Sequence, residues 1–126
     1  MHQIILDTNF LLIPIQFKVD IFQEMQRVCD FRYALCIVDQ TLEELNQISL
    51  QGKVKDRLAA KVAISLVRSK EIQILDSHME KVDDAITRLA EPGVIVATND
   101  RGLKRRVLEK GARVLALRQE KYLILS

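Results

Sequence analysis

Short apolar runs alternate along the chain with longer segments in which apolar residues recur every three or four positions. The short runs show no polar alternation, which is typical of strands buried on both faces of a sheet. Five strands are predicted, at residues 3–6, 34–38, 72–75, 94–97 and 112–117. The longer segments have the spacing of amphipathic helices. Five helices are predicted, at about 18–29, 41–50, 55–69, 81–91 and 101–110.

This alternation of strands and helices predicts an α/β fold, built as a three-layer sandwich around a mainly parallel sheet. Residues 1–126 are expected to form a single domain, because the length supports one core and no repeat or linker divides the chain. In such sheets, sites lie beyond the carboxyl ends of the strands. The residues that follow each strand are therefore the first candidates for chemistry.

The composition, 48% hydrophobic and 29% charged, is that of a globular chain rather than a disordered one. Its 19 basic and 17 acidic residues leave a net charge of +2, which alone does not indicate a nucleic-acid-binding protein. No apolar stretch approaches the roughly 20 residues of a membrane-spanning helix. The N-terminus has no basic segment followed by an apolar one, so we expect a cytoplasmic protein without a membrane partner.

Acidic residues stand where the strand ends are predicted. Asp7 follows the first strand in "LDTNFLL", and Asp100 follows the fourth strand in "VATND". Two acidic doublets lie near the starts of predicted helices, in "LEEL" and "VDDAI". On a helical wheel, the doublet member that flanks the buried side is Glu44 in the first and Asp83 in the second. These four residues are the candidates for a shared site.

Each acid also has a purely structural explanation. Thr41-Leu42-Glu43-Glu44 fits a capping box, in which Glu44 only ties down a helix start. Asp83 would favour a helix N-terminus through the helix dipole, and Asp7 or Asp100 would serve as a turn or N-cap residue. Four carboxylates at one edge of a sheet are harder to explain in this way, because their repulsion makes the ionised forms costly without a cation. Oxygen ligands select hard ions such as Mg²⁺ or Mn²⁺, which can activate water and neutralise charge on a phosphodiester.

The acidic motifs carry a resemblance to a known family. In order and at fitting intervals, "LDTNFLL", "LEEL", "VDDAI" and "VATNDRGLKRR" resemble the successive acidic motifs of the PIN-domain nuclease family. The resemblance spans nearly the whole chain. The longer segments "DTNFLLIPIQFKVDIF" and "LALRQEKYL" are more similar to the branch related to ribosomal-RNA-processing PIN proteins than to the small toxin branch.

The resemblance implies a sheet of strand order 3-2-1-4-5 and a metal-dependent endoribonuclease that hydrolyses single-stranded RNA in rRNA processing. The catalytic residues and Mg²⁺ or Mn²⁺ ligands that it implies are Asp7, Glu44, Asp83 and Asp100. Asp83 matches the family's third acid because Ile86 follows it at the usual interval, and Asp84 is then an accessory at most. The residues that would orient carboxylates or bound waters are Thr8, Asn9, Thr98 and Asn99.

Basic residues follow Asp100 directly. Positive side chains beside a metal site position a phosphate backbone without sequence choice, so this group is expected to bind RNA. Its members are Arg101, Lys104, Arg105 and Arg106. A second basic stretch, residues 53–61, is interpreted as a solvated helix face. Most of the few aromatic residues are interpreted as core or interface residues rather than base-stacking platforms.

Other functions stay open at this stage. A toxin-like PIN ribonuclease would be held by an antitoxin partner, and a non-catalytic module would bind RNA, such as an rRNA precursor, during ribosome assembly. A phosphotransfer domain with an aspartyl nucleophile is a weaker alternative, because haloacid-dehalogenase-like enzymes place a second aspartate where Asn9 stands. Homodimerisation, which would lengthen an RNA groove, is a further hypothesis.

Overall fold

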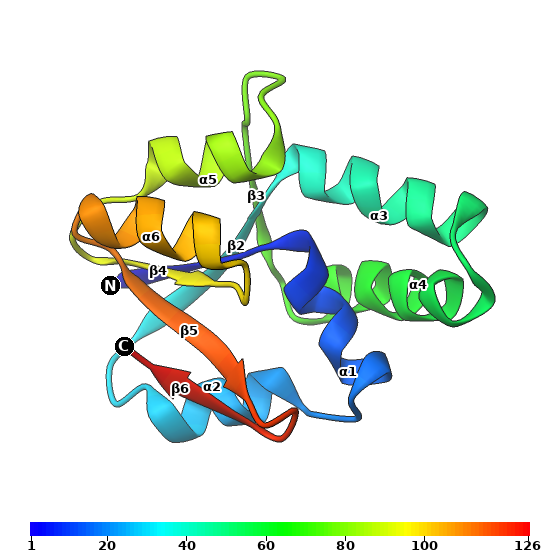
Figure 1. Ribbon diagram of the computed structural model, residues 1–126, viewed down its shortest axis with the longest axis horizontal. Coiled ribbons are helices and arrows are strands. Elements are labelled where there is room, and N and C mark those ends of the chain that lie inside the picture. Colours follow the sequence, from blue (N-terminus) through cyan, green and yellow to red (C-terminus); the bar gives the residue numbers. More distant parts are fainter.

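The computed structural model describes residues 1–126 and contains one six-stranded sheet of order β3-β2-β1-β4-β5-β6 (Figure 1). Neighbouring strands are parallel, except that β5 and β6 are antiparallel. The strands are β1 (His2–Leu6), β2 (Tyr33–Val38), β3 (Gln73–Leu75), β4 (Val94–Ala97), β5 (Arg113–Arg118) and β6 (Tyr122–Leu125). The five predicted strands and their order 3-2-1-4-5 are confirmed, and β6 extends the sheet beyond β5.

The five predicted helices are also present, each within three residues of its expected ends. The helix predicted at about 18–29 begins later, at Ile21, because Asp20 caps it. The Asp20 carboxylate accepts hydrogen bonds from the N–H groups of Phe22 and Gln23. The helices are the 3-10 turn η1 (Thr8–Leu12), α1 (Ile13–Gln16), α2 (Ile21–Val28), α3 (Asp39–Gln51), α4 (Val54–Ser69), α5 (Val82–Leu89) and α6 (Arg101–Glu109).

Three short elements lie outside the predicted set. Strand β6 follows β5 through a turn in which Gln119 and Glu120 have φ of 56° and 55°. Such left-handed turns usually carry Gly, Asn or Asp, so no turn signal marks this hairpin in the sequence. The other two elements are η1 and α1, in which residues 10–13 are buried and return the chain to the core directly after Asp7.

Helices cover both faces of the sheet, which confirms the three-layer sandwich (Figure 1). Strand β1 shows how the layers are built. Ile4 and Leu6 pack into a core of 22 buried residues that includes residues of α1 to α4, whereas Ile5 packs into a core of 13 that includes residues of α5 and α6. Burial on both faces explains the missing polar alternation. None of the helices has the length and apolar character needed to cross a membrane.

The pairing of β1 with β4 brings the candidate site together. Leu6 lies opposite Ala97, so Asp7 and Thr98 leave the two strands at the same edge of the sheet. The N–H of Asp7 continues this pairing by donating to the carbonyl of Ala97 at 3.0 Å. Helix α3 begins directly after β2 at the same edge. The carboxyl ends of these parallel strands therefore deliver polar residues to one place, as expected for an α/β sheet.

Candidate active site

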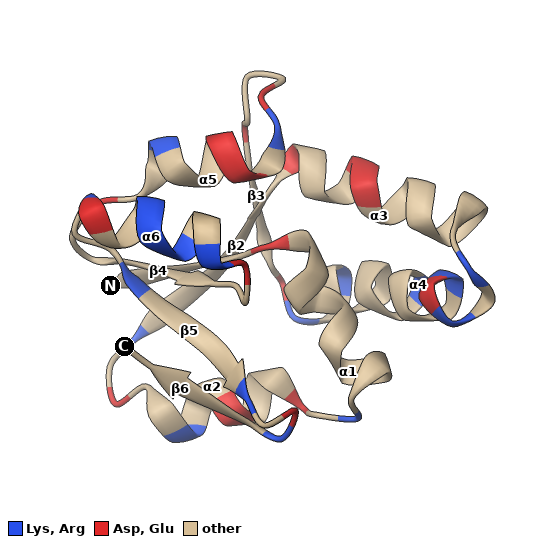
Figure 2. Ribbon diagram, in the orientation of Figure 1, with Lys and Arg blue, Asp and Glu red and all other residues tan.

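All four predicted acidic site residues line one cavity at the carboxyl edge of the sheet, which we call the acidic cavity. Its volume is about 450 Å³, and its acidic residues are Asp7, Glu44, Asp83 and Asp100. They come from the end of β1, from α3, from α5 and from the N-cap of α6. Figure 2 shows the acidic segments of these elements around one region, with basic segments of α6 beside it. The doublet partners Glu43 and Asp84 do not line this cavity.

Asp7 is the most enclosed of the four acids. Its Oδ1 accepts a hydrogen bond from the N–H of Thr8, and its Oδ2 accepts one from the hydroxyl of Thr98, both at 2.8 Å. Burial raises the pKa of Asp7; the hydrogen bonds from Thr98 and Thr8 oppose this, and the charges of Asp100 and Glu44 raise the pKa further. The net pKa is above the ordinary value for aspartate, so a bound cation would relieve the cost of ionising this carboxyl.

Asp100 and Asp7 share the hydroxyl of Thr98. Thr98 is 1% exposed, and while its hydroxyl donates to Asp7 it accepts a hydrogen bond from the N–H of Asp100 at 3.0 Å. Asp100 also caps α6, because its Oδ1 accepts from the N–H of Leu103 at 3.1 Å. The structural explanation for Asp100 is therefore correct, but the cap engages one oxygen and is compatible with a second role for the carboxylate.

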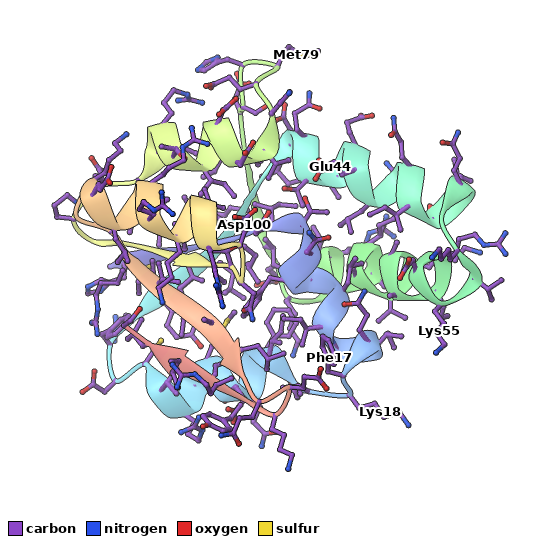
Figure 3. The ribbon with its side chains drawn as sticks, viewed as in Figure 1. Phe17, Lys18, Glu44, Lys55, Met79 and Asp100 are labelled. Carbon is purple, nitrogen blue, oxygen red and sulfur yellow. The ribbon has the colours of Figure 1, made fainter.

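The capping-box explanation for Glu44 is wrong. Helix α3 begins at Asp39 with Val38 as its N-cap, so Glu44 lies inside the helix rather than in its first turn. Its Oε1 instead accepts a hydrogen bond from the hydroxyl of Thr8 at 2.5 Å. Thr8 thus contacts the acids of two elements, through its N–H to Asp7 and its hydroxyl to Glu44. Figure 3 shows Glu44 on α3 and Asp100 at the start of α6, on either side of the segment that follows β1.

Arg106 of α6 pairs with the acidic doublet of α5. Its Nη2 lies 2.9 Å from Oδ1 of Asp84, and its Nη1 lies 3.6 Å from Oδ2 of Asp83. The sequence predicts an RNA-binding role for Arg106, but in the structure its guanidinium pairs with these carboxylates. The remaining basic residues of the group, which form no ion pair in the chain, are Arg101, Lys104 and Arg105.

The two asparagines behave differently from one another. Asn9 is exposed and lines the acidic cavity, as its predicted role requires. Asn99 contacts no carboxylate. Its amide instead makes two hydrogen bonds to the backbone of Leu117, donating to the carbonyl at 3.0 Å and accepting from the N–H at 2.8 Å. Asn99 therefore ties the end of β4 to β5 and shapes the site through the backbone.

Four residues that are not among the predicted site residues also line the acidic cavity. They are Gln40, Met79, Lys81 and Val82. Met79 lies in the loop before α5, has a φ of 64° and is 84% exposed. Lys81 is the N-cap residue of α5, and Val82 separates it from the doublet. Lys81 and Val82 lie beside the acidic doublet in "KVDDAI", which is the sequence signal that points to them.

The donor set of the acidic cavity suits a hard divalent cation. Its charged oxygen ligands are carboxylates, which Mg²⁺ and Mn²⁺ prefer, and no thiol or imidazole lines the cavity. As they stand, the side chains form no ready-made cluster of three acidic, histidine or cysteine ligands around one point. Mg²⁺ usually keeps several waters and takes only one or two carboxylates directly. The arrangement therefore fits a partly hydrated ion better than one enclosed by protein ligands.

Comparison with known proteins decides the family. The profile of a family described as "PIN like domain" matches residues 4–120. The chain belongs to this PIN-like domain family. The match covers all four acids of the cavity and confirms the resemblance inferred from the acidic motifs.

The relatives of this PIN-like chain include ribonucleases and rRNA-processing proteins. Ribonuclease VapC4 of Methanocaldococcus jannaschii is 31% identical over 97% of this chain and 95% of its own length. The rRNA-processing protein FCF1 of Saccharomyces cerevisiae is 34% identical over 84% of this chain, which spans about half (54%) of FCF1. The solved structure of the PIN domain endonuclease Utp24 shares the fold, with a TM-score of 0.78 over 98% of this chain and 90% of that chain at 23% identity.

Proposed function

We propose that this chain is a metal-dependent endoribonuclease that hydrolyses phosphodiester bonds of single-stranded RNA. The observation that carries the proposal is the acidic cavity, where carboxylates from four separate elements face one space. A core built only for stability has no use for such an arrangement, because it concentrates like charges around a half-buried aspartate. The likeness to ribonuclease VapC4 over nearly its whole length supports the same activity.

Each acid has a defined place in this proposal. Asp7, Glu44, Asp83 and Asp100 would hold Mg²⁺ or Mn²⁺ at the carboxyl edge of the sheet. When bound, the cation supplies an activated water and neutralises the charge that builds on the phosphodiester. The chain positions these ligands by the hydroxyl of Thr98, which contacts both Asp7 and Asp100, and by Thr8, which contacts Asp7 and Glu44.

The start of α6 would hold the RNA backbone. Arg101, Lys104 and Arg105 lie within the first two turns after Asp100 and carry no acidic partner. Contacts between these side chains and phosphate groups would give an affinity that falls as salt rises and that does not depend on base sequence. Arg106 would act differently, by holding the doublet of α5 against α6.

For the biological role, we propose rRNA processing. The extended motifs after Asp7 and at β5, together with 34% identity to FCF1, support this assignment. A toxin-like ribonuclease with an antitoxin partner is the alternative, supported by the match to VapC4 from end to end. Accumulation of rRNA precursors on loss of the gene would favour the first role. Growth arrest on expression, relieved by a neighbouring small protein, would favour the second.

The test of the activity is cleavage of matched nucleic acids by the purified chain. A single-stranded RNA, the same RNA as a duplex and the corresponding single-stranded DNA would each be incubated with Mn²⁺, Mg²⁺ or a chelator. We expect cleavage of single-stranded RNA with metal only, and cleavage of a circular form of it, which requires internal attack. RNA that is bound but not cleaved with either metal would contradict the proposal and favour a non-catalytic RNA-binding module.

A further inference from the structure

A second cavity adjoins the acidic cavity and shares three of its lining residues, Asp7, Asn9 and Asp100. Its volume is about 410 Å³, and its character is different, since four of its nine lining residues are hydrophobic. The residues that it does not share with the acidic cavity are Phe10, Ile13, Gln16, Phe17, Asn99 and Leu117. We call this space the side cavity. The first proposal gives it no role.

Phe17 is the unusual member of the side cavity. It is 39% exposed and is the only Phe or Tyr of the chain that is exposed rather than buried or half-buried. Its backbone is fixed, because its N–H closes α1 by donating to the carbonyl of Ile13 at 2.8 Å. Lys18 then has a φ of 55°, which turns the chain away. Phe17 thus stands at the end of α1, where it lines the side cavity (Figure 3).

The other walls of the side cavity combine a fixed apolar surface with free amides. The two hydrogen bonds between Asn99 and the backbone of Leu117 hold that wall in place. The amides of Asn9 and Gln16 are exposed, and neither is engaged in a hydrogen bond within the chain. An amide can both donate and accept, so these two side chains can meet the edge of any base.

We propose that the side cavity binds the base of a nucleotide next to the scissile phosphate, with Phe17 stacking on the face of that base. This proposal rests on the proposed ribonuclease activity and names a base-binding subsite for it. Unpaired bases of single-stranded RNA are commonly held by stacking on aromatic side chains, a contact that tolerates every base. Phe17 is therefore an exception to the interpretation of the aromatic residues as core or interface residues.

The charges around the side cavity favour a base over a phosphate. Asp7 and Asp100 line it, and no Lys or Arg does, so a phosphate placed there would be repelled. A neutral base meets no such repulsion and removes the apolar surface of Phe17 and Leu117 from water. The phosphate itself would remain at the acidic cavity, where the proposed cation would offset the carboxylates and where Lys81 lines the wall. One nucleotide would then span both cavities.

The experiment is a scan with short single-stranded RNAs that each lack one base. The abasic position moves stepwise across the cleavage point, and cleavage is measured with Mn²⁺ for wild type and Phe17→Ala. We expect one abasic position to slow cleavage by wild type about 5- to 150-fold, the range for loss of one base–aromatic stack. Phe17→Ala should cleave the intact RNA equally slowly and should be insensitive to that position. Phe17→Trp should restore both properties.

Three controls keep the two proposals apart. Leu58→Ala removes an exposed apolar side chain on α4, which lies outside both cavities, and should behave as wild type. The subsite alone would be overturned if wild type cleaved all the abasic RNAs at the rate of the intact RNA. It would also be overturned if the cleavage rates of Phe17→Ala depended on the abasic position as those of wild type do. If no RNA is cleaved at all, the ribonuclease proposal fails. The subsite is then judged by 2-aminopurine-labelled RNA, whose fluorescence must be quenched by wild type and not by Phe17→Ala.

Discussion

The hydroxyl of Thr98 donates a hydrogen bond to Oδ2 of Asp7 at 2.8 Å, although the two residues stand 91 positions apart in the chain. The same hydroxyl accepts from the N–H of Asp100 at 3.0 Å. One buried hydroxyl therefore fixes the acids of two neighbouring strands relative to each other. The contact exists because β1 and β4 are parallel neighbours that end at the same level. It links the sheet order directly to the geometry of the candidate site.

Replacing Thr98 by valine should damage the site while preserving its shape. Thr98→Val leaves Oδ2 of Asp7 without its donor and the N–H of Asp100 without an acceptor. We expect the free energy of unfolding to fall by about 1–3 kcal/mol, the usual cost of unpaired buried polar groups. Cleavage should slow by roughly 10- to 100-fold, as for residues that orient metal ligands. Thr98→Ser, which keeps the hydroxyl, is the control, and a valine variant with wild-type kinetics would show that this hydroxyl does not position the acids.

Within each acidic doublet, only one residue should be needed for cleavage. Glu44 and Asp83 line the acidic cavity, whereas Glu43 and Asp84 do not. We therefore expect Glu44→Gln and Asp83→Asn to lose about 100-fold or more in cleavage rate, at or beyond the upper end for residues around a metal site. Glu43→Gln is the matched control for α3 and should stay close to wild type, and Asp84→Asn should lose no more than Arg106→Gln, which breaks the same ion pair. Equal losses for both members of a doublet would mean that the cavity does not define the ligand set.

The raised pKa of Asp7 predicts a pH-dependent cost to folding. Because burial raises this pKa, the folded chain binds the proton more tightly than the unfolded chain. Stability contributed by this group is therefore lost as pH rises from the ordinary aspartate value of about 3.9 to the raised pKa of the folded state. Asp7→Asn removes this cost. With a chelator at pH 7, its Tm should exceed that of wild type, and the difference should shrink toward acidic pH.

Metal should reverse this order of stability. A cation that binds the folded wild type raises its Tm by mass action, and Asp7→Asn lacks one of the proposed ligands. Thermal unfolding of both proteins across a Mn²⁺ titration measures the effect. An Asp7→Asn variant less stable than wild type in chelator at neutral pH would contradict the assignment of a strained, ionised Asp7. Equal Mn²⁺ shifts for the two proteins would remove Asp7 from the ligand set.

The basic residues of α6 should separate into two classes. Lys104→Gln combined with Arg105→Gln should weaken RNA binding and reduce the slope of log affinity against log salt by about 1.4, near 0.7 for each phosphate contact to a single strand. Arg106→Gln should leave that slope unchanged, because its guanidinium pairs with Asp83 and Asp84. Its effect should appear in the Mn²⁺ dependence of cleavage instead. An equal change of salt slope in both variants would show that Arg106 also contacts RNA.

Much of the fold and the acidic site could be predicted from local patterns. Strands buried on both faces appear as unbroken apolar runs, and a parallel sheet collects the residues after its strands at one edge, which located Asp7 and Asp100. The helical wheel selected Glu44 and Asp83 as the doublet members that flank the buried side, and both line the acidic cavity. The strand order could be predicted only from the family resemblance, because periodicity alone does not order a sheet. The motifs were likewise identified through that resemblance.

The remaining features depend on contacts that no local pattern records. The hairpin of β5 and β6 turns through Gln119 and Glu120, which are not typical turn residues. Arg106 pairs with Asp83 and Asp84 because α5 packs beside α6, a contact that the sequence does not record. From the sequence alone, the position of Arg106 shortly after Asp100 suggests RNA binding instead. The exposure of Phe17 follows from the end of α1, a helix of four residues too short to show periodicity.

The most direct test of the central claim is the rate at which wild type and Asp7→Asn cleave one circular, uniformly labelled single-stranded RNA. Both proteins would be purified identically and assayed with Mn²⁺ and with chelator. We predict linearisation and further cleavage by wild type with Mn²⁺ only, and a loss of about 100-fold or more in the variant. Equal cleavage by both proteins, or cleavage by wild type that persists in chelator, would contradict the account.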